Sequence, residues 1–124
     1  MKKFALVVGD KTYMDCHFKL GRYFADNSIS VVVRNCFGAV ARITVCLANS
    51  DGLDVDLANG LSFVDTNNCP WAVDFLERNG FAKSTGVAKD SGYCQYPLMK
   101  FDIKKLQEYS ENYDDNGDMV KGGA

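Results

Sequence analysis

The chain contains one short helix whose beginning and end are both marked in the sequence. Asn68 is a residue type that caps helix N-termini, and a proline suited to the first helical turn follows two positions later. Gly80 provides a left-handed stop. Between these signals Trp71 and Phe75 lie one turn apart and give the segment an apolar stripe. The sequence therefore predicts a main helix over about residues 70–79 that packs this stripe on a sheet.

Strand-forming patterns precede and follow this helix. Residues 40–47 alternate so that one side is wholly apolar, which is typical of an antiparallel sheet with one solvated face. Residues 83–92 are rich in Gly, Ser and Lys but lack phosphate-loop spacing, so we interpret them as a connecting loop. Asp102 caps a final short helix over residues 103–109. The predicted strands cover residues 3–8, 12–18, 29–33, 40–47, 61–64 and 93–101.

These patterns predict an α+β fold: an antiparallel sheet of about five or six strands, the main helix on one face and the short C-terminal helix beside it. With 124 residues the chain has the size of one domain, which we place at residues 1–109. Residues 110–124 are acidic, have no apolar period, and are predicted to be a disordered tail. No apolar run is long enough to span a membrane and no secretory signal is found, so we expect a cytoplasmic protein without membrane contacts.

The residue types that usually carry chemistry form no recognisable constellation in the sequence. The five cysteines are an odd number without C-x-x-C spacing, which indicates reduced thiols and no zinc site. His17 is the one histidine, and its spacing identifies neither a partner acid nor a nucleophile. We therefore assign no catalytic residues and expect no metal and no cofactor.

Acidic residues are concentrated in the middle of the chain. The net charge is −2, but residues 43–77 hold six acids and no Lys or Arg. No Glu follows at the last position of an EF-hand loop, so the D-x-D spacing does not predict a calcium site. We interpret four of these acids as a patch that faces a basic partner: Asp51, Asp54, Asp56 and Asp65. The sign of the charge alternates along the chain, so direct nucleic-acid binding is not expected.

An alternative site precedes the main helix. Asn67, Asn68 and Cys69 stand before the predicted N-terminus, where an anion is favoured and the pKa of a thiol falls. Tyr93 and Gln95 are predicted to line the same side. Such a cluster would serve a small-ligand-binding protein or an enzyme, and a nucleophilic Cys69 would need a basic partner.

Three stretches carry a resemblance to a known family: F-V-D-T-N-N-C-P-W-A (63–72), F-L-E-R-N-G (75–80) and S-G-Y-C-Q-Y-P-L-M-K-F-D (91–102). Over roughly residues 21–106 the chain resembles a small bacterial family, a domain of unknown function carried by phages and conjugative elements. The resemblance implies no catalytic residues. It implies the setting of small accessory proteins of mobile elements, among which anti-restriction and anti-CRISPR inhibitors are common. We therefore favour a non-enzymatic protein that binds a host protein or nucleoprotein complex.

Overall fold

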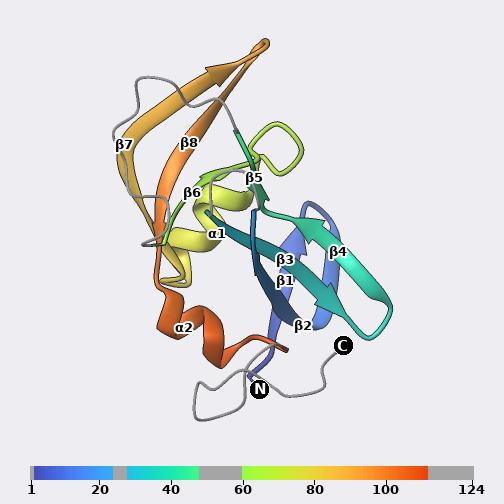
Figure 1. Cartoon of the computed structure of the whole chain (residues 1–124). Helices are drawn as coiled ribbons and strands as arrows, with labels where there is room; N and C mark the ends of the chain where they lie inside the picture. The colour runs from blue at the N-terminus through green and yellow to red at the C-terminus, as the bar shows by residue number, and fades with distance from the viewer. Residues whose placement is uncertain (1, 24–27, 48–59, 112–124) are drawn as a thin grey trace.

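The computed structural model describes residues 2–23, 28–47 and 60–111. In these ranges the chain forms two four-stranded antiparallel sheets and two short helices around a shared core (Figure 1). The α+β class predicted from the sequence is confirmed, whereas the prediction of one sheet of five or six strands is wrong. No helix in these ranges is long and apolar enough to cross a membrane.

The first sheet is a meander in which each strand pairs with the next along the chain. Gly9, at φ 63°, occupies the first turn, where a left-handed backbone favours glycine. The Asn35 side-chain oxygen accepts a hydrogen bond from the Phe37 N–H (2.9 Å) in the last turn. Buried and outward-facing residues alternate along the middle strands, so one face packs on the core. The strand order is β1 (Phe4–Val8), β2 (Lys11–Arg22), β3 (Ile29–Asn35) and β4 (Gly38–Arg42).

The second sheet contains a strand where the sequence predicts a connecting loop at residues 83–92. This strand begins a hairpin that turns at Gly92, at φ 61°. Gly86, at φ 85°, lies in a bulge, and most side chains of the strand are exposed. The segment therefore lacks the apolar alternation by which a strand is identified in sequence. The strand order is β5 (Thr44–Val45), β6 (Leu61–Val64), β8 (Cys94–Phe101) and β7 (Ala82–Ser91).

A single residue, Ile43, separates β4 from β5 and connects the two sheets. Its N–H donates to the carbonyl of Val31 in β3 (3.0 Å). Its carbonyl accepts a hydrogen bond from the N–H of Asp65, directly after β6 (2.8 Å). Its side chain is fully buried in the core. The strand predicted over residues 40–47 thus leaves the first sheet and joins the second.

Buried hydroxyl groups form hydrogen bonds at the same junction between the two sheets. The Thr44 hydroxyl accepts a hydrogen bond from the Val31 N–H and contacts the Tyr23 hydroxyl, each at 3.0 Å. The Ser62 hydroxyl donates to the carbonyl of Ile29 (2.8 Å). Thr44 and Ser62 are both buried. Because a buried polar group without a partner costs about 1–3 kcal/mol, these contacts fix how the two sheets meet.

Helix α1 (Ala72–Arg78) begins later than the sequence predicts. Its N-cap residue is Trp71, which makes no side-chain capping bond. The predicted cap, Asn68, instead binds the Asp65 carboxylate through its backbone N–H (3.3 Å) and its side-chain amide (2.8 Å). The Asp65 side chain therefore closes a turn before the helix, and the prediction of Asn68 as the cap is wrong.

The C-terminal end of α1 is the one that the sequence predicts. Gly80 adopts φ 70°, and its N–H donates to the carbonyl of Glu77 (3.2 Å). The N–H of Phe81 reaches back to the carbonyl of Leu76 (2.9 Å). These two bonds form a Schellman ending, which directs Phe81 into the core.

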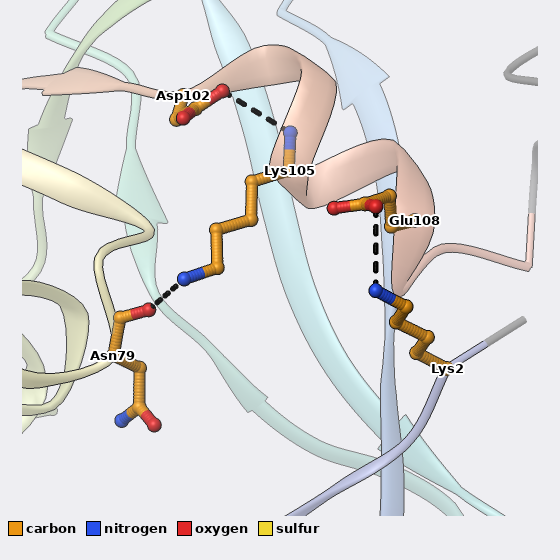
Figure 2. Close-up of polar contacts among 5 residues, drawn as sticks. All are labelled: Lys2, Asn79, Asp102, Lys105 and Glu108. Atoms are coloured by element: carbon orange, nitrogen blue, oxygen red, sulfur yellow. Dashed lines mark hydrogen bonds and ion pairs between the residues drawn. The ribbon is translucent and has the colours of Figure 1, made fainter.

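Helix α2 (Ile103–Glu108) is capped by Asp102, as predicted. The Asp102 carboxylate accepts a hydrogen bond from the Lys105 N–H (3.1 Å), as Figure 2 shows. The Lys105 ammonium group extends across to the carbonyl of Asn79 at the end of α1, where a cation offsets the helix dipole. Figure 2 also shows the ion pair between Lys2 and Glu108 (3.3 Å).

Backbone hydrogen bonds to the first sheet continue past the boundary predicted at residue 109. The Phe18 N–H donates to the carbonyl of Tyr109 (2.8 Å), and the Glu111 N–H donates to the carbonyl of Phe18 (3.0 Å). Ser110, between them, is fully buried. Ser110 and Glu111 therefore belong to the folded domain, and the rest of the predicted tail, residues 112–124, lies outside the described residues.

The core is organised around the ring of Phe81, which is only 2% exposed. Four aromatic rings surround it at centroid distances of 5.0–5.8 Å: Phe4, Phe18, Phe75 and Tyr109. They belong to β1, β2, α1 and the residue that follows α2. One side chain therefore contacts elements from both ends of the described chain.

We expect Phe81→Ala to lower the free energy of unfolding by about 3–5 kcal/mol, because it opens a cavity among four rings. Urea denaturation followed by fluorescence measures the change. The control is Phe37→Ala, whose ring is 94% exposed and which we expect to change stability by less than about 0.5 kcal/mol. Similar losses in the two variants would contradict the central role of Phe81.

Candidate functional site

The predicted acidic patch falls mainly outside the described residues. Asp51, Asp54 and Asp56 lie in the undescribed range 48–59. Asp65 is described, and both of its carboxylate oxygens accept hydrogen bonds from Asn68. Asp65 therefore has a structural role in the turn before α1.

The predicted ligand cluster before α1 is brought together only in part. Cys69 is 4% exposed, and its Sγ donates to the carbonyl of Arg42 (3.4 Å). Burial and the neighbouring Asp65 carboxylate raise the pKa of the Cys69 thiol. The sequence analysis expects the opposite direction, since it places Cys69 at the helix N-terminus. Because α1 begins at Ala72 and Cys69 is buried, desolvation and negative charge prevail, and Cys69 lacks the features of a nucleophile.

The other members of this cluster differ in their surroundings. Asn67 is exposed in the turn before α1. The backbone carbonyl of Gln95 accepts a hydrogen bond from the hydroxyl of Thr66 in the same turn (3.3 Å). This contact brings the start of β8 against the turn before α1. Tyr93 is fully exposed at the end of the β7–β8 hairpin, which extends away from the helices in Figure 1. Gln95 thus lies beside the predicted cluster, while Tyr93 contributes an exposed ring at the hairpin end.

A charged cluster that the sequence did not reveal lies on the outer face of the first sheet. His17 in β2 is directly opposite Arg34 in β3. The His17 Nε2 lies 2.5 Å from one carboxylate oxygen of Glu111, and Arg34 Nη1 lies 3.7 Å from the other. Glu111 is 94 residues from His17 in sequence and sits in the segment predicted to be disordered, so sequence spacing gave no signal for this contact.

This cluster holds Glu111 against the first sheet, and the described residues around His17 do not form a catalytic arrangement. The Nδ1 atom of His17 is buried without a hydrogen-bond partner among the described residues. A histidine base would need a nucleophile or substrate group at one nitrogen and an orienting acid at the other, but among the described residues Glu111 alone binds the ring. The pair instead anchors Glu111, whose N–H also bonds to β2.

A groove of about 400 Å³ lies between the end of α1 and the second sheet. Lys83 and Lys100 line it from directly opposite positions on β7 and β8, and Asp102 lies in the same groove. The two lysines outnumber the single acid, so the groove carries a net positive charge, although like charges at opposite positions repel. Among the described residues, no three side chains of His, Cys, Asp or Glu come together as metal ligands.

Comparison with known proteins identifies a family. Residues 17–120 match the model of a family described as a domain of unknown function, DUF4313. The matched range begins at His17 within β2. It includes strands β3 to β8, both helices and Glu111. No curated protein and no solved structure matches the chain.

We expect Glu111→Ala to lower the free energy of unfolding by about 1–2 kcal/mol, because it removes a charged hydrogen-bond partner from a mostly buried histidine. The side chains of His17 and Glu111 are 13% and 32% exposed. Urea denaturation tests this against Glu108→Ala, which breaks the more exposed pair with Lys2 and should cost less than about 0.5 kcal/mol. If the two variants lose equal stability, the contact does not anchor Glu111 to the first sheet.

We expect iodoacetamide at neutral pH to alkylate Cys36, which is exposed, well before Cys69. Folding raises the pKa of Cys69 above its ordinary value of 9.0. Below pH 9.0 the neutral Cys69 thiol therefore contributes its full stabilisation to the folded state. This stabilisation is lost as the pH rises through the pKa of Cys69 in the folded protein. Unfolding measured across this alkaline range should become less pH-dependent in Cys69→Ala and stay unchanged in Cys36→Ala. Rapid labelling of Cys69 in the folded protein would contradict this assignment.

Proposed function

The chain belongs to the DUF4313 family, and from this premise we propose that it is a non-enzymatic protein that binds a host protein or nucleoprotein complex. The observation that carries the proposal is that His17 and two buried thiols, those of Cys16 and Cys69, are held in structural contacts. His17 is bound to Glu111, and Cys69 to the Arg42 carbonyl. Burial raises the pKa of Cys16 as well, which disfavours a reactive thiolate.

Exposed aromatic side chains support a role in binding. Tyr93 is fully exposed and Phe37 is 94% exposed, each in a turn between paired strands. Aromatic side chains are enriched at protein interfaces because they bury a large area on contact. Two hairpin ends thus present the kind of side chain that anchors a protein complex.

The proposed partner is a host complex whose binding surface is basic. The resemblance to accessory proteins of phages and conjugative elements supports a cytoplasmic inhibitor of a defence complex, of the anti-CRISPR or anti-restriction type. The acids Asp51, Asp54 and Asp56 would occupy a groove that normally receives phosphates. Asp65 does not join them in this proposal, because Asn68 engages its carboxylate.

A small-ligand or enzymatic role for the segment from Asn67 to Trp71 has less support. The helix starts at Ala72, after the predicted cluster, and Cys69 is buried with a raised pKa. Neither observation favours an anion or a nucleophile at this position.

The proposal is tested by affinity capture of the tagged protein from bacterial lysates that contain defence complexes. A captured partner is then titrated against the triple variant Asp51→Asn, Asp54→Asn, Asp56→Asn. We expect affinity to fall roughly tenfold at low salt and its salt dependence to flatten, because three negative charges are removed. The control neutralises three acids outside the patch, Asp114, Asp115 and Asp118. Equal affinities and salt slopes in all three proteins would eliminate the patch, and absence of any partner would count against the binding function.

A further inference from the structure

A second cationic groove, with a volume of about 280 Å³, lies on the outer face of the first sheet. It crosses β2, β3 and β4, which are neighbours in this sheet (Figure 1). Three cations line it, and small residues form part of the remaining lining: Lys19, Arg34 and Arg42, with Gly21, Ser30 and Ala39. Among the described residues no acid lines this groove, in contrast to the groove that contains Asp102. Its positive charge is therefore not balanced from within the lining.

Glu111 occupies one row of this face and leaves the next row without a carboxylate. His17 and Arg34 lie opposite each other on β2 and β3, and the Glu111 carboxylate contacts them at 2.5 and 3.7 Å. The next row on the same face holds Lys19 on β2 and Arg42 on β4. No carboxylate of the described residues lies within ion-pair distance of either side chain. The second row thus has two cations that the described acids do not neutralise.

The last described residues run beside β2 and in the same direction. Ser110 forms a parallel bridge with Phe18 of β2, and the Glu111 N–H donates to the carbonyl of Phe18 (3.0 Å). A parallel pairing means that the chain at Glu111 is directed along β2 from the row of His17 towards the row of Lys19. The described chain therefore ends at the groove and points to its second cationic row.

The segment that follows Glu111 carries the complementary charge. Residues 112–124 lie outside the described residues. They contain three aspartates and one lysine, which gives this segment a net charge of −2: Asp114, Asp115, Asp118 and Lys121. The whole chain also has a net charge of −2, so the remainder of the chain is neutral overall. The net charge of the remainder therefore does not repel this acidic segment at long range.

The spacing of the aspartates suits the positions of the two cations. Neighbouring rows on one face of a strand are about 6.6–6.8 Å apart, whereas three extended residues span about 10 Å. Asp114, three positions after Glu111, can therefore reach Lys19. Lys19 and Arg42 are separated by two strand spacings, or about 9.4–9.8 Å, and four extended residues span about 13 Å. Asp118 can therefore reach Arg42 while Asp114 contacts Lys19.

We propose that residues 112–124 fold back across the outer face of the first sheet and occupy this groove, with Asp114 at Lys19 and Asp118 at Arg42. Exposed ion pairs are individually weak, but the segment is tethered at Glu111. Its effective concentration at the groove is on the order of millimolar, so weak pairs are enough to seat it. Arg42 adds a planar fork of donors that matches a carboxylate. The inference goes beyond the proposed function and needs no host partner, because it assigns an internal ligand that any other anion has to displace.

The test measures backbone order parameters by NMR for residues 112–118 of the isotopically labelled full chain at low ionic strength. The groove variant is Lys19→Ala/Arg42→Ala. The matched control, Lys83→Ala/Lys100→Ala, removes the same charge from the other groove, and all four side chains are exposed. A third variant exchanges the charges by combining Lys19→Glu/Arg42→Glu with Asp114→Lys/Asp118→Lys. Circular dichroism confirms that each variant folds.

We expect order parameters above about 0.6 in the wild type, the control and the charge-exchanged variant, and below about 0.6 in the groove variant. Raising the salt concentration of the wild type to about 1 M should lower its values to those of the groove variant, because the screening length falls to about 3 Å. Recovery in the charge-exchanged variant shows that the aspartates pair directly with the two cations.

Three results would overturn the proposed occupant. Values below about 0.6 in the wild type would show that the segment does not dock. An equal decrease in the control would show a general effect of charge, and ordering that disappears on about tenfold dilution would assign the groove to the segment of a second copy. The measurement uses the isolated chain, so its failure leaves the proposed function to the capture experiment, and failure of the capture experiment leaves this inference standing.

Discussion

The two sheets depend on one residue that belongs to neither. Ile43 donates its N–H to the first sheet and offers its carbonyl to the second, while its side chain is buried between them. A single strand cannot lie in two sheets unless its hydrogen bonding changes sides along the way. The buried hydroxyls of Thr44 and Ser62 hold the adjacent strands at the same junction. With the sheets fixed in this way, α1 and α2 close a common core instead of covering one face.

The ends of the described chain are held by a different set of contacts. Phe81 follows the Schellman ending of α1 and gathers rings from β1, β2 and the residue after α2. Beyond Tyr109 the chain pairs with β2 at Phe18, which places Glu111 on the outer face of the first sheet. The carboxylate that meets His17 and Arg34 is therefore positioned by the aromatic core on the opposite face of the same strand. The aromatic core and the charged cluster thus lie on opposite faces of β2.

This arrangement supports the binding role that we propose. The thiols of Cys16 and Cys69 are buried, and the histidine is held by an acid that anchors the chain. Charge is instead displayed on open surfaces, where two grooves present cations from neighbouring strands. Surface charges of this kind contribute modestly to affinity but strongly to the choice and orientation of a partner.

The sequence by itself determined the stop of α1 at Gly80, the Asp102 cap and, from such local patterns, the α+β class. Each depends on residues within a few positions of one another. Only the tertiary structure decided the division into two sheets, the bulged strand β7, the role of Asn68 and the contact of Glu111 with His17. Asn68 and Asp65 are only three positions apart, but a hydrogen bond from the Asp65 N–H to the carbonyl of Ile43 holds Asp65 in place. Glu111 meets His17 across 94 residues. Local patterns report which conformation a segment prefers, but pairing between distant segments is set by the core that they share.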